Sequence, residues 1–267
     1  MSQIGTALIT GASAGIGKEL ANMFAKKGHD LILVARRKPE LDALAAELSG
    51  QYDIGTRVEV ADLAIEGAAD ELFERVSDAE VEILVNNAGV LTSGSFRRMK
   101  PAAIDNMIRV NVLGLTGLCH RFVQPMLDRG HGRILNVASI AGFQAVPTLA
   151  VYAATKAYVL SLGEALSVET DNSDVSVTTV CPGFTDTDML HGATDKAKAA
   201  APNIPDLAVL SPQRVAQDAY NACMSGDAIK VPGIGYSLTM AATRLVPRWV
   251  LRQTGAMALR FASTKRR

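Results

Sequence analysis

The sequence predicts one α/β domain with a doubly wound, parallel central sheet that helices flank on both faces. Six short runs rich in β-branched residues alternate with longer segments of helical periodicity along the 267 residues. The runs are almost continuously apolar, which is typical of strands buried on both faces, and the connections are long enough for parallel crossovers. We therefore expect one domain that begins with residues 1–235 and continues in a basic extension of the same domain at 236–267.

The expected elements follow one another in the order that parallel crossovers require. Strands are expected at the runs TALIT (6–10), LILVA (31–35), RVEVA (57–61), EILVNN (82–87), RILNVAS (133–139) and VSVTTVCP (175–182). Helices are expected at 16–28, 39–49, 65–77, 101–129 and 151–170. No Pro- or Ser-rich linker and no repeat divides this pattern, so one domain is the simplest interpretation.

The composition argues against several classes of protein. A hydrophobic content of 48% supports a substantial core, and 27 basic against 27 acidic residues give no overall charge that would steer the chain toward nucleic acid. Cys119, Cys181 and Cys223 have neither CxxC nor Cys/His spacing, so we expect no disulfide framework and no metal site. The sequence has no signal-peptide pattern and no apolar stretch of the roughly 18 residues that a membrane span needs. The expectation is a cytoplasmic protein.

A glycine-rich turn follows the first expected strand, in the stretch LITGASAGIG at 8–17. Gly11, Gly15 and Gly17 would let the backbone turn tightly and approach a phosphate, and Ser13 would add a hydroxyl donor. At this place in a doubly wound sheet the N-terminus of the next helix attracts a pyrophosphate. The spacing Gly-x-x-x-Gly-x-Gly differs from the commonest dinucleotide fingerprint, so a purely structural glycine turn is the alternative.

Two arginines, Arg36 and Arg37, end the second expected strand, where an enzyme that selects NAD usually carries an acidic residue. A guanidinium group suits the 2′-phosphate of NADP, whereas a carboxylate would repel it. These residues predict a preference for NADP(H), with NAD(H) as a possible second coenzyme. A solvated basic loop is the alternative.

Further polar residues follow the third and fourth expected strands. The side chain of Asp62 could accept a hydrogen bond from an adenine amino group, and Asn87, Ala88 and Gly89 could line the adenine ribose. Taken singly, each could equally belong to an Asx turn or a strand-end cap. Their occurrence together, at the carboxyl ends of neighbouring strands, favours a ligand site.

Candidate catalytic residues lie further along the chain. Tyr152 and Lys156 are four residues apart and share one face of a helix, and Ser139 ends the preceding strand. Carbonyl reduction needs, besides a hydride donor, a proton for the alkoxide and hydrogen bonds to the carbonyl oxygen. We expect Lys156 to lower the pKa of Tyr152 from its usual value of about 10, and Ser139 to orient the substrate oxygen.

Asn111 lies in an otherwise apolar stretch, RVNVLG. It could hold a water molecule in a proton relay toward Lys156. It could also be only a polar residue that bends its helix, and the Tyr152 and Lys156 pair alone could be a surface pair.

In their order along the chain, these motifs resemble the classical short-chain dehydrogenase/reductase family. The resemblance rests on residues 10–17, Asp62, NNAG (86–89), Asn111, Ser139, Tyr152 with Lys156, and PGFTDT (182–187), and spans about residues 5–190. It implies a Rossmann-type fold, a nicotinamide cofactor and a catalytic set of Ser139, Tyr152, Lys156 and Asn111. It also implies that residues 1–235 form the cofactor-binding and catalytic domain, with a substrate lid at about 188–210.

The resemblance also implies contacts to the nicotinamide half of the cofactor from Pro182, Gly183, Phe184, Thr185 and Thr187. Many NADP-dependent relatives carry a basic residue where this chain has Ala14, so the NADP(H) preference depends mainly on Arg36 and Arg37. The complete set of expected cofactor contacts is Gly11, Ser13, Gly15, Ile16, Gly17, Arg36, Arg37, Asp62, Leu63, Asn87, Ala88, Gly89, Tyr152, Lys156, Pro182, Gly183, Thr185 and Thr187.

The expected function is that of an NADP(H)-dependent oxidoreductase, which transfers a hydride between the nicotinamide and a carbonyl or secondary alcohol substrate with Tyr152 as general acid/base. The alternative is an NADP(H)-binding sensor or scaffold without turnover. Candidate walls of the substrate pocket are Val146, Leu149, Met189 and Leu190, each of which could equally belong to the ordinary core. The sequence carries no specific signal for a sugar, a nucleotide or a small carboxylate, so an apolar ketone or aldehyde of medium size is the default expectation.

The basic extension repeats arginine every four residues at Arg244, Arg248 and Arg252, between apolar residues. It could cover the substrate cleft or a subunit interface, associate with an anionic membrane surface, or recognise an acidic group on a substrate. The first of these is the simplest interpretation. The family resemblance implies a homo-oligomer, a dimer or tetramer formed through the helices at 101–129 and 151–170.

Overall fold

The protein is described by a computed structural model that covers residues 4–191, 208–233 and 235–237. Most of the expected lid at 188–210 lies outside these residues. Nearly all of the expected basic extension at 236–267, including Arg244, Arg248 and Arg252, also lies outside them.

A seven-stranded sheet forms the centre of the molecule, with the order β3-β2-β1-β4-β5-β6-β7 and parallel pairing throughout. The strands are β1 Ile4–Thr10, β2 His29–Ala35, β3 Thr56–Val60, β4 Val81–Asn86, β5 Gly132–Val137, β6 Val175–Val180 and β7 Ile229–Lys230. The predicted fold class is confirmed. The sequence did not predict β7, because a strand of two residues carries no periodicity.

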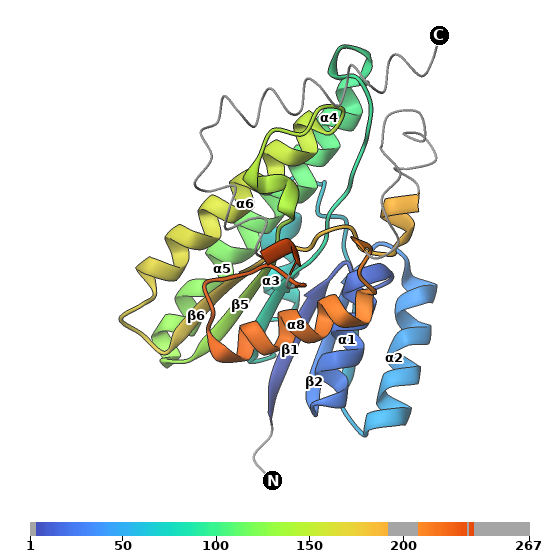
Figure 1. The fold of residues 1–267 in the computed structure, drawn as a ribbon. Coiled ribbons are helices and arrows are strands. Elements are labelled where there is room, and N and C mark those ends of the chain that lie inside the picture. Colours follow the sequence, from blue (N-terminus) through green and yellow to red (C-terminus); the bar gives the residue numbers. More distant parts are fainter. Residues whose placement is uncertain (1–3, 192–207, 234, 238–267) are drawn as a thin grey trace.

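Helices cover both faces of the sheet (Figure 1). Those described are α1 Gly15–Lys26, α2 Lys38–Tyr52, α3 Ala68–Arg75, α4 Pro101–Ile108, α5 Leu115–Arg129, α6 Ala150–Glu169 and α8 Pro212–Ser225. Residues of α1, α2 and α8 form one buried cluster with the sheet, and residues of α3, α5 and α6 form the other. In the described part of the chain, no helix combines the length and the apolar character that a membrane crossing requires.

The two clusters explain why the strands are apolar along their whole length. Successive side chains of a strand point to opposite faces, so Ile9 of β1 enters the cluster on one face and Leu8 the cluster on the other. Both side chains are completely buried. Each central strand must therefore be apolar at even and odd positions alike, which produces the continuous runs seen in the sequence.

The prediction of a single helix at 101–129 is wrong in one respect. A π-helical turn, Arg109–Gly114 (η2), separates α4 from α5, and Asn111 lies within it. Such a turn inserts extra backbone into a helix and is often found at functional sites. The helix expected at 65–77 is shorter than predicted, because α3 begins only at Ala68, after Gly67 with its positive φ of 80°.

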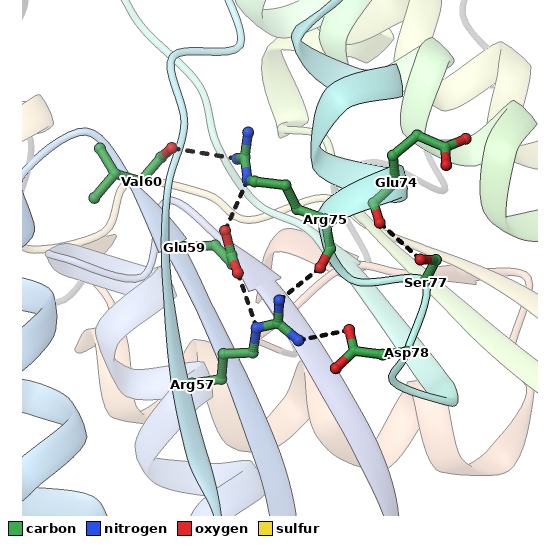
Figure 2. Close-up of polar contacts among 7 residues, drawn as sticks. All are labelled: Arg57, Glu59, Val60, Glu74, Arg75, Ser77 and Asp78. Carbon is green, nitrogen blue, oxygen red and sulfur yellow. Dashed lines mark hydrogen bonds and ion pairs between the residues drawn. The ribbon is translucent and has the colours of Figure 1, made fainter.

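A cluster of ion pairs holds the edge strand β3 against α3, as Figure 2 shows. The Glu59 carboxylate accepts hydrogen bonds from the Nε atoms of Arg57 and Arg75, both at 2.8 Å. Arg57 also donates to Asp78 at 2.7 Å. The side chain of Glu59 is only 11% exposed. The cluster therefore joins the strand that precedes residues 61–67 to the helix that follows them, and this segment carries Asp62.

Replacing Glu59 by alanine should destabilise the protein, because two arginines would lose their shared carboxylate. We expect the free energy of unfolding, measured by urea denaturation, to fall by about 2 kcal/mol. Asp78→Ala is the matched control, since that carboxylate is 72% exposed and its loss should change stability little. Equal stability of the two variants would contradict a structural role for Glu59.

Candidate active site

A cavity of about 970 Å³ opens at the carboxyl edge of the sheet. It is lined by residues that end or follow β1, β2, β4, β5 and β6, as expected for an open parallel sheet. All the expected cofactor contacts line it, and so do Ser139, Phe184 and the expected pocket walls Val146, Leu149, Met189 and Leu190. Of the expected catalytic residues, only Asn111 is not among its lining residues.

The cavity lies where the strand order reverses, between β1 and β4, and Thr10 joins these two strands. Its hydroxyl donates to the carbonyl of Val85 at 3.1 Å and accepts from the backbone N–H groups of Asn87 and Ala88, both at 3.0 Å. The Asn87 amide donates back to the carbonyls of Thr10 and Gly11, at 2.9 and 3.3 Å. These bonds fit the strand-end cap that the sequence offered as the alternative for Asn87, and its contact to a ribose stays a prediction.

The glycine turn after β1 has a geometry that larger residues would disturb. Gly11 and Gly15 adopt positive φ angles of 68° and 54°, in the region that favours glycine. A Cβ atom at Gly17 would overlap the carbonyl oxygen of Gly11 and the amide of Asn87. The turn therefore brings the start of α1 directly against the cavity.

The N-terminus of α1 suits an anionic ligand. Ala14 stands at the N-cap and has no polar side chain to cap the helix, and the first turn contains no acidic residue. Gly15, Ile16 and Gly17 line the cavity from this first turn. Free backbone N–H groups and the positive end of the helix dipole thus face the cavity, which is the arrangement that binds phosphates.

The two arginines after β2 form another part of the wall. Arg37 donates to the Ser13 carbonyl at 3.2 Å and to its hydroxyl at 3.1 Å. Arg36 lies 3.9 Å from the Asp62 carboxylate, which also accepts the N–H of Ala64 at 3.0 Å in an Asx turn. Arg37 also lies 3.4 Å from the Glu40 carboxylate. Both arginine side chains are more than half exposed and line the cavity beside the glycine turn, where a ligand can reach them.

The other wall of the cavity contains Ser139, Tyr152 and Lys156. Tyr152 and Lys156 lie one turn apart on α6 and are 9% and 4% exposed. Ser139 caps a short 3₁₀ turn, Ile140–Phe143 (η3), and its hydroxyl accepts the N–H of Ala141 at 3.1 Å. This turn packs closely on α6, because a Cβ atom at Gly142 would lie 2.8 Å from the Lys156 carbonyl. The three side chains are thus brought together from two segments.

Burial dominates the titration of this group. Burial raises the pKa of Tyr152, and a hydrogen bond with Ser139 offsets part of the rise. Burial lowers the pKa of Lys156 from 10.5 to about 8. The expected lowering of the Tyr152 pKa by Lys156 is not seen, because the ammonium group lies 5.9 Å from the centre of the phenol ring and donates instead to the Val137 carbonyl, at 2.7 Å.

Asn111 connects the segment after β4 to α6. Its Oδ1 atom accepts the N–H of Val90 at 2.8 Å, and its Nδ2 atom donates to the Val90 carbonyl at 3.0 Å and to Thr155 at 3.1 Å. The side chains of Asn111 and Lys156 both approach Gly89, where a Cβ atom would be 3.5 Å from Asn111 Oδ1 and from Lys156 Nζ. The helix-bending interpretation fits this position, and the water relay stays a prediction.

The remaining wall of the cavity is mostly apolar. Val146, Leu149, Met189 and Leu190 are joined there by residues that the sequence analysis did not select: Leu91, Gln144, Ala208 and Tyr236. These come from four separate segments, and no local motif marks them. Within the described residues, no group of three His, Cys, Asp or Glu side chains is placed to hold a metal ion.

Comparison with known proteins decides the family. The family model described as short chain dehydrogenase matches residues 5–198. The chain belongs to this family. Oxidoreductase UcpA of Escherichia coli K12 is 37% identical over 204 residues, which are 75% of this chain and 76% of that protein. The predicted enzyme class, an oxidoreductase, is confirmed.

Solved structures of related enzymes resemble this chain over nearly its whole length. A short-chain dehydrogenase from Sphingobium yanoikuyae, in complex with NADPH, has 32% identity and a TM-score of 0.81, covering 96% of both chains. A bulky-bulky ketone specific alcohol dehydrogenase from Comamonas testosteroni has 30% identity and a TM-score of 0.78, covering 91% of this chain and 94% of that one.

The lowered pKa of Lys156 predicts a dependence of stability on pH. Between about pH 8 and 10.5 the folded protein has released the Lys156 proton while the unfolded chain still binds it, so this residue's contribution to stability rises with pH. We expect wild type to gain roughly 1–2 kcal/mol of unfolding free energy relative to Lys156→Met between pH 8 and pH 10. Urea denaturation of both proteins, without added coenzyme, measures this. A constant difference would contradict the lowered pKa.

Proposed function

We propose that this chain is an NADP(H)-dependent oxidoreductase that interconverts a carbonyl compound and the corresponding secondary alcohol. One observation carries the proposal: Ser139, Tyr152 and Lys156 converge on the same cavity as the glycine turn and the two arginines. The NADPH complex of the Sphingobium yanoikuyae relative supports the choice of coenzyme. Since family relatives are named oxidoreductases, turnover is favoured over the sensor or scaffold alternative.

The residues around the cavity fit the parts of NADP(H). The glycine turn and the start of α1 would hold the pyrophosphate, and Arg36 and Arg37 the 2′-phosphate. Asp62 and Leu63 would contact the adenine, residues 87–89 its ribose, and residues 182–187 the nicotinamide half. The coenzyme supplies or accepts the hydride when it is bound.

Tyr152 would move the proton. Because an ordinary phenol is protonated at neutral pH and burial raises the pKa of Tyr152 further, Tyr152 is suited to donate a proton to the alkoxide that forms during reduction. The Ser139 hydroxyl would hold the carbonyl oxygen within reach of this proton. Lys156 has a pKa of about 8 and so carries most of its charge at pH 7, and its side chain lines the same cavity, where it would contact the bound coenzyme.

The substrate proposed is an apolar ketone or aldehyde. Its end of the cavity is formed largely by aliphatic and aromatic side chains, including Leu91, Leu149 and Met189. The Comamonas testosteroni relative is described as specific for bulky-bulky ketones, which supports an apolar carbonyl compound.

The proposed assembly is a homo-oligomer in the cytoplasm. An apolar groove outside the cavity lies between α4 and α6, where Ile104, Ile108, Val151 and Ala154 line it. Ile108 is 40% exposed, so this face offers an apolar surface to a second copy. A dimer or tetramer formed through these helices agrees with the expectation from the sequence.

Replacing Tyr152 by phenylalanine tests the proposed reaction. With NADPH and a panel of apolar ketones and aldehydes, we expect kcat to fall by about 100-fold or more, because the proton donor is lost. Binding of NADPH, followed by its fluorescence, should persist. Tyr158→Phe is the matched control: it removes an exposed hydroxyl from the same helix, bonded to Thr116 at 3.0 Å. Unchanged turnover in Tyr152→Phe would refute the role of Tyr152.

Replacing the two arginines tests the coenzyme preference. In Arg36→Ala/Arg37→Ala we expect the KM for NADPH to rise about 10-fold or more, with little change for NADH, since only NADPH has the 2′-phosphate. The neighbouring Lys38→Ala is the control, because Lys38 pairs with Asp42 and does not line the cavity. An equal effect on both coenzymes would show that the arginines do not read the 2′-phosphate.

A further inference from the structure

Tyr236 lies at the substrate end of the cavity, beyond residues 5–198 that the family model matches. Its ring packs directly on the backbone of Gly183, where a Cβ atom would overlap three ring carbons. Glycine at position 183 therefore makes room for this ring. The contact brings a residue near the end of the described chain against the loop that follows β6.

The hydroxyl of Tyr236 bridges two segments of backbone. It donates to the Ala208 carbonyl at 2.6 Å and accepts the N–H of Phe184 at 3.3 Å. Burial raises the pKa of Tyr236 above its usual value of 10, so the phenol keeps the proton that it donates to Ala208. Since both its donor and an acceptor position are used by backbone groups, this hydroxyl serves to hold the chain.

The two bridged segments also pair with each other. The N–H of Leu210 donates to the Phe184 carbonyl at 2.8 Å, and the N–H of Asp186 donates to the Leu210 carbonyl at 3.0 Å. Thr185 and Leu210 form an isolated parallel bridge. Two backbone hydrogen bonds thus join the loop after β6 directly to Leu210, and the Tyr236 hydroxyl adds one bond to each segment, donated to Ala208 and accepted from Phe184.

Gly233 turns the chain toward the paired segments at residues 184–186 and 208–210. It has a positive φ of 84°, and a Cβ atom there would lie 3.3 Å from the Leu210 side chain. Its carbonyl accepts the N–H of Ser237 at 3.0 Å, which forms the short turn that carries Tyr236. Three chain segments, around residues 184, 209 and 236, therefore meet at the phenol.

We propose that Tyr236 is a positioning residue that clasps the loop after β6 to residues 208–210 and thereby fixes the substrate-side wall of the cavity. Phe184 is the group most directly placed by this clasp, because its N–H is bonded to Tyr236 and its side chain lines the cavity while 39% exposed. The kinetic part of this inference rests on the proposed reductase function. The structural part does not.

Hydrogen exchange of the full chain tests the clasp without any turnover. In Tyr236→Phe the Phe184 N–H loses its acceptor and the Ala208 carbonyl loses its donor. We expect the amides of Phe184, Asp186 and Leu210 to exchange about 3- to 10-fold faster, since one neutral hydrogen bond is worth about this factor. Peptides from β5 should not change. Tyr52→Phe, which removes a hydroxyl at the end of α2 away from the cavity, is the matched control.

Steady-state kinetics test the consequence for the substrate. Tyr236→Phe should raise the KM for a bulky apolar ketone by about 3- to 10-fold and change kcat by less than about twofold. The pH profile of kcat should stay as in wild type, because no proton passes through Tyr236. A proton donor would behave in the opposite way, with a large loss in kcat.

The outcomes separate the two proposals. Faster exchange in both segments together with a higher KM supports the clasp. Unchanged exchange, or faster exchange in one segment alone, overturns it, and faster exchange with an unchanged KM overturns its role for the substrate. If wild type turns over no carbonyl compound, the proposed function fails, and the exchange result alone decides whether Tyr236 holds the two segments together.

Discussion

The hydrogen bonds of Thr10 at the junction of β1 and β4 are the constraint on which the rest of the site depends. These parallel strands lie side by side in the sheet, but the chain continues from β1 into α1 on one face and from β4 toward α5 on the other. The Thr10 hydroxyl has three backbone partners, and these bonds hold the end of β1 to the end of β4. The cavity, the glycine turn and the start of α1 all take their position from this point, so a ligand meets backbone that is already ordered.

The ion pairs at the sheet edge and the side-chain amide of Asn111 also hold segments near the cavity in place through hydrogen bonds. Glu59 fixes the two ends of the segment that carries Asp62, and Asn111 fixes the segment after β4 to α6 through Val90 and Thr155. In each case a buried polar side chain is bonded to groups on neighbouring elements, which avoids the cost of leaving it unpaired. The walls of the cavity are thus set by side chains that do not line it.

Much of the fold and of the coenzyme side of the site could be predicted because their signals are local. A strand buried on both faces needs apolar residues at every position, and the turn after β1 needs glycine at Gly11 and Gly17. The π-helical turn at Asn111 had only one signal, a polar residue in an apolar stretch. The raised pKa of Tyr152 had none, because it depends on how completely the fold buries the phenol. Tyr236 was missed because its partners are distant in sequence.

This difference between the two ends of the cavity has a physical cause. The coenzyme end is built from strand ends and the turns next to them, so altering it would disturb the sheet itself. The substrate end is assembled from loops, and its contacts are hydrogen bonds and packing between segments such as those of Phe184, Ala208 and Tyr236. Such segments can change in sequence while the sheet stays intact. The strand ends and the glycine turn are therefore fixed by the fold itself, whereas the loop wall around Tyr236 can vary in sequence without disturbing the sheet.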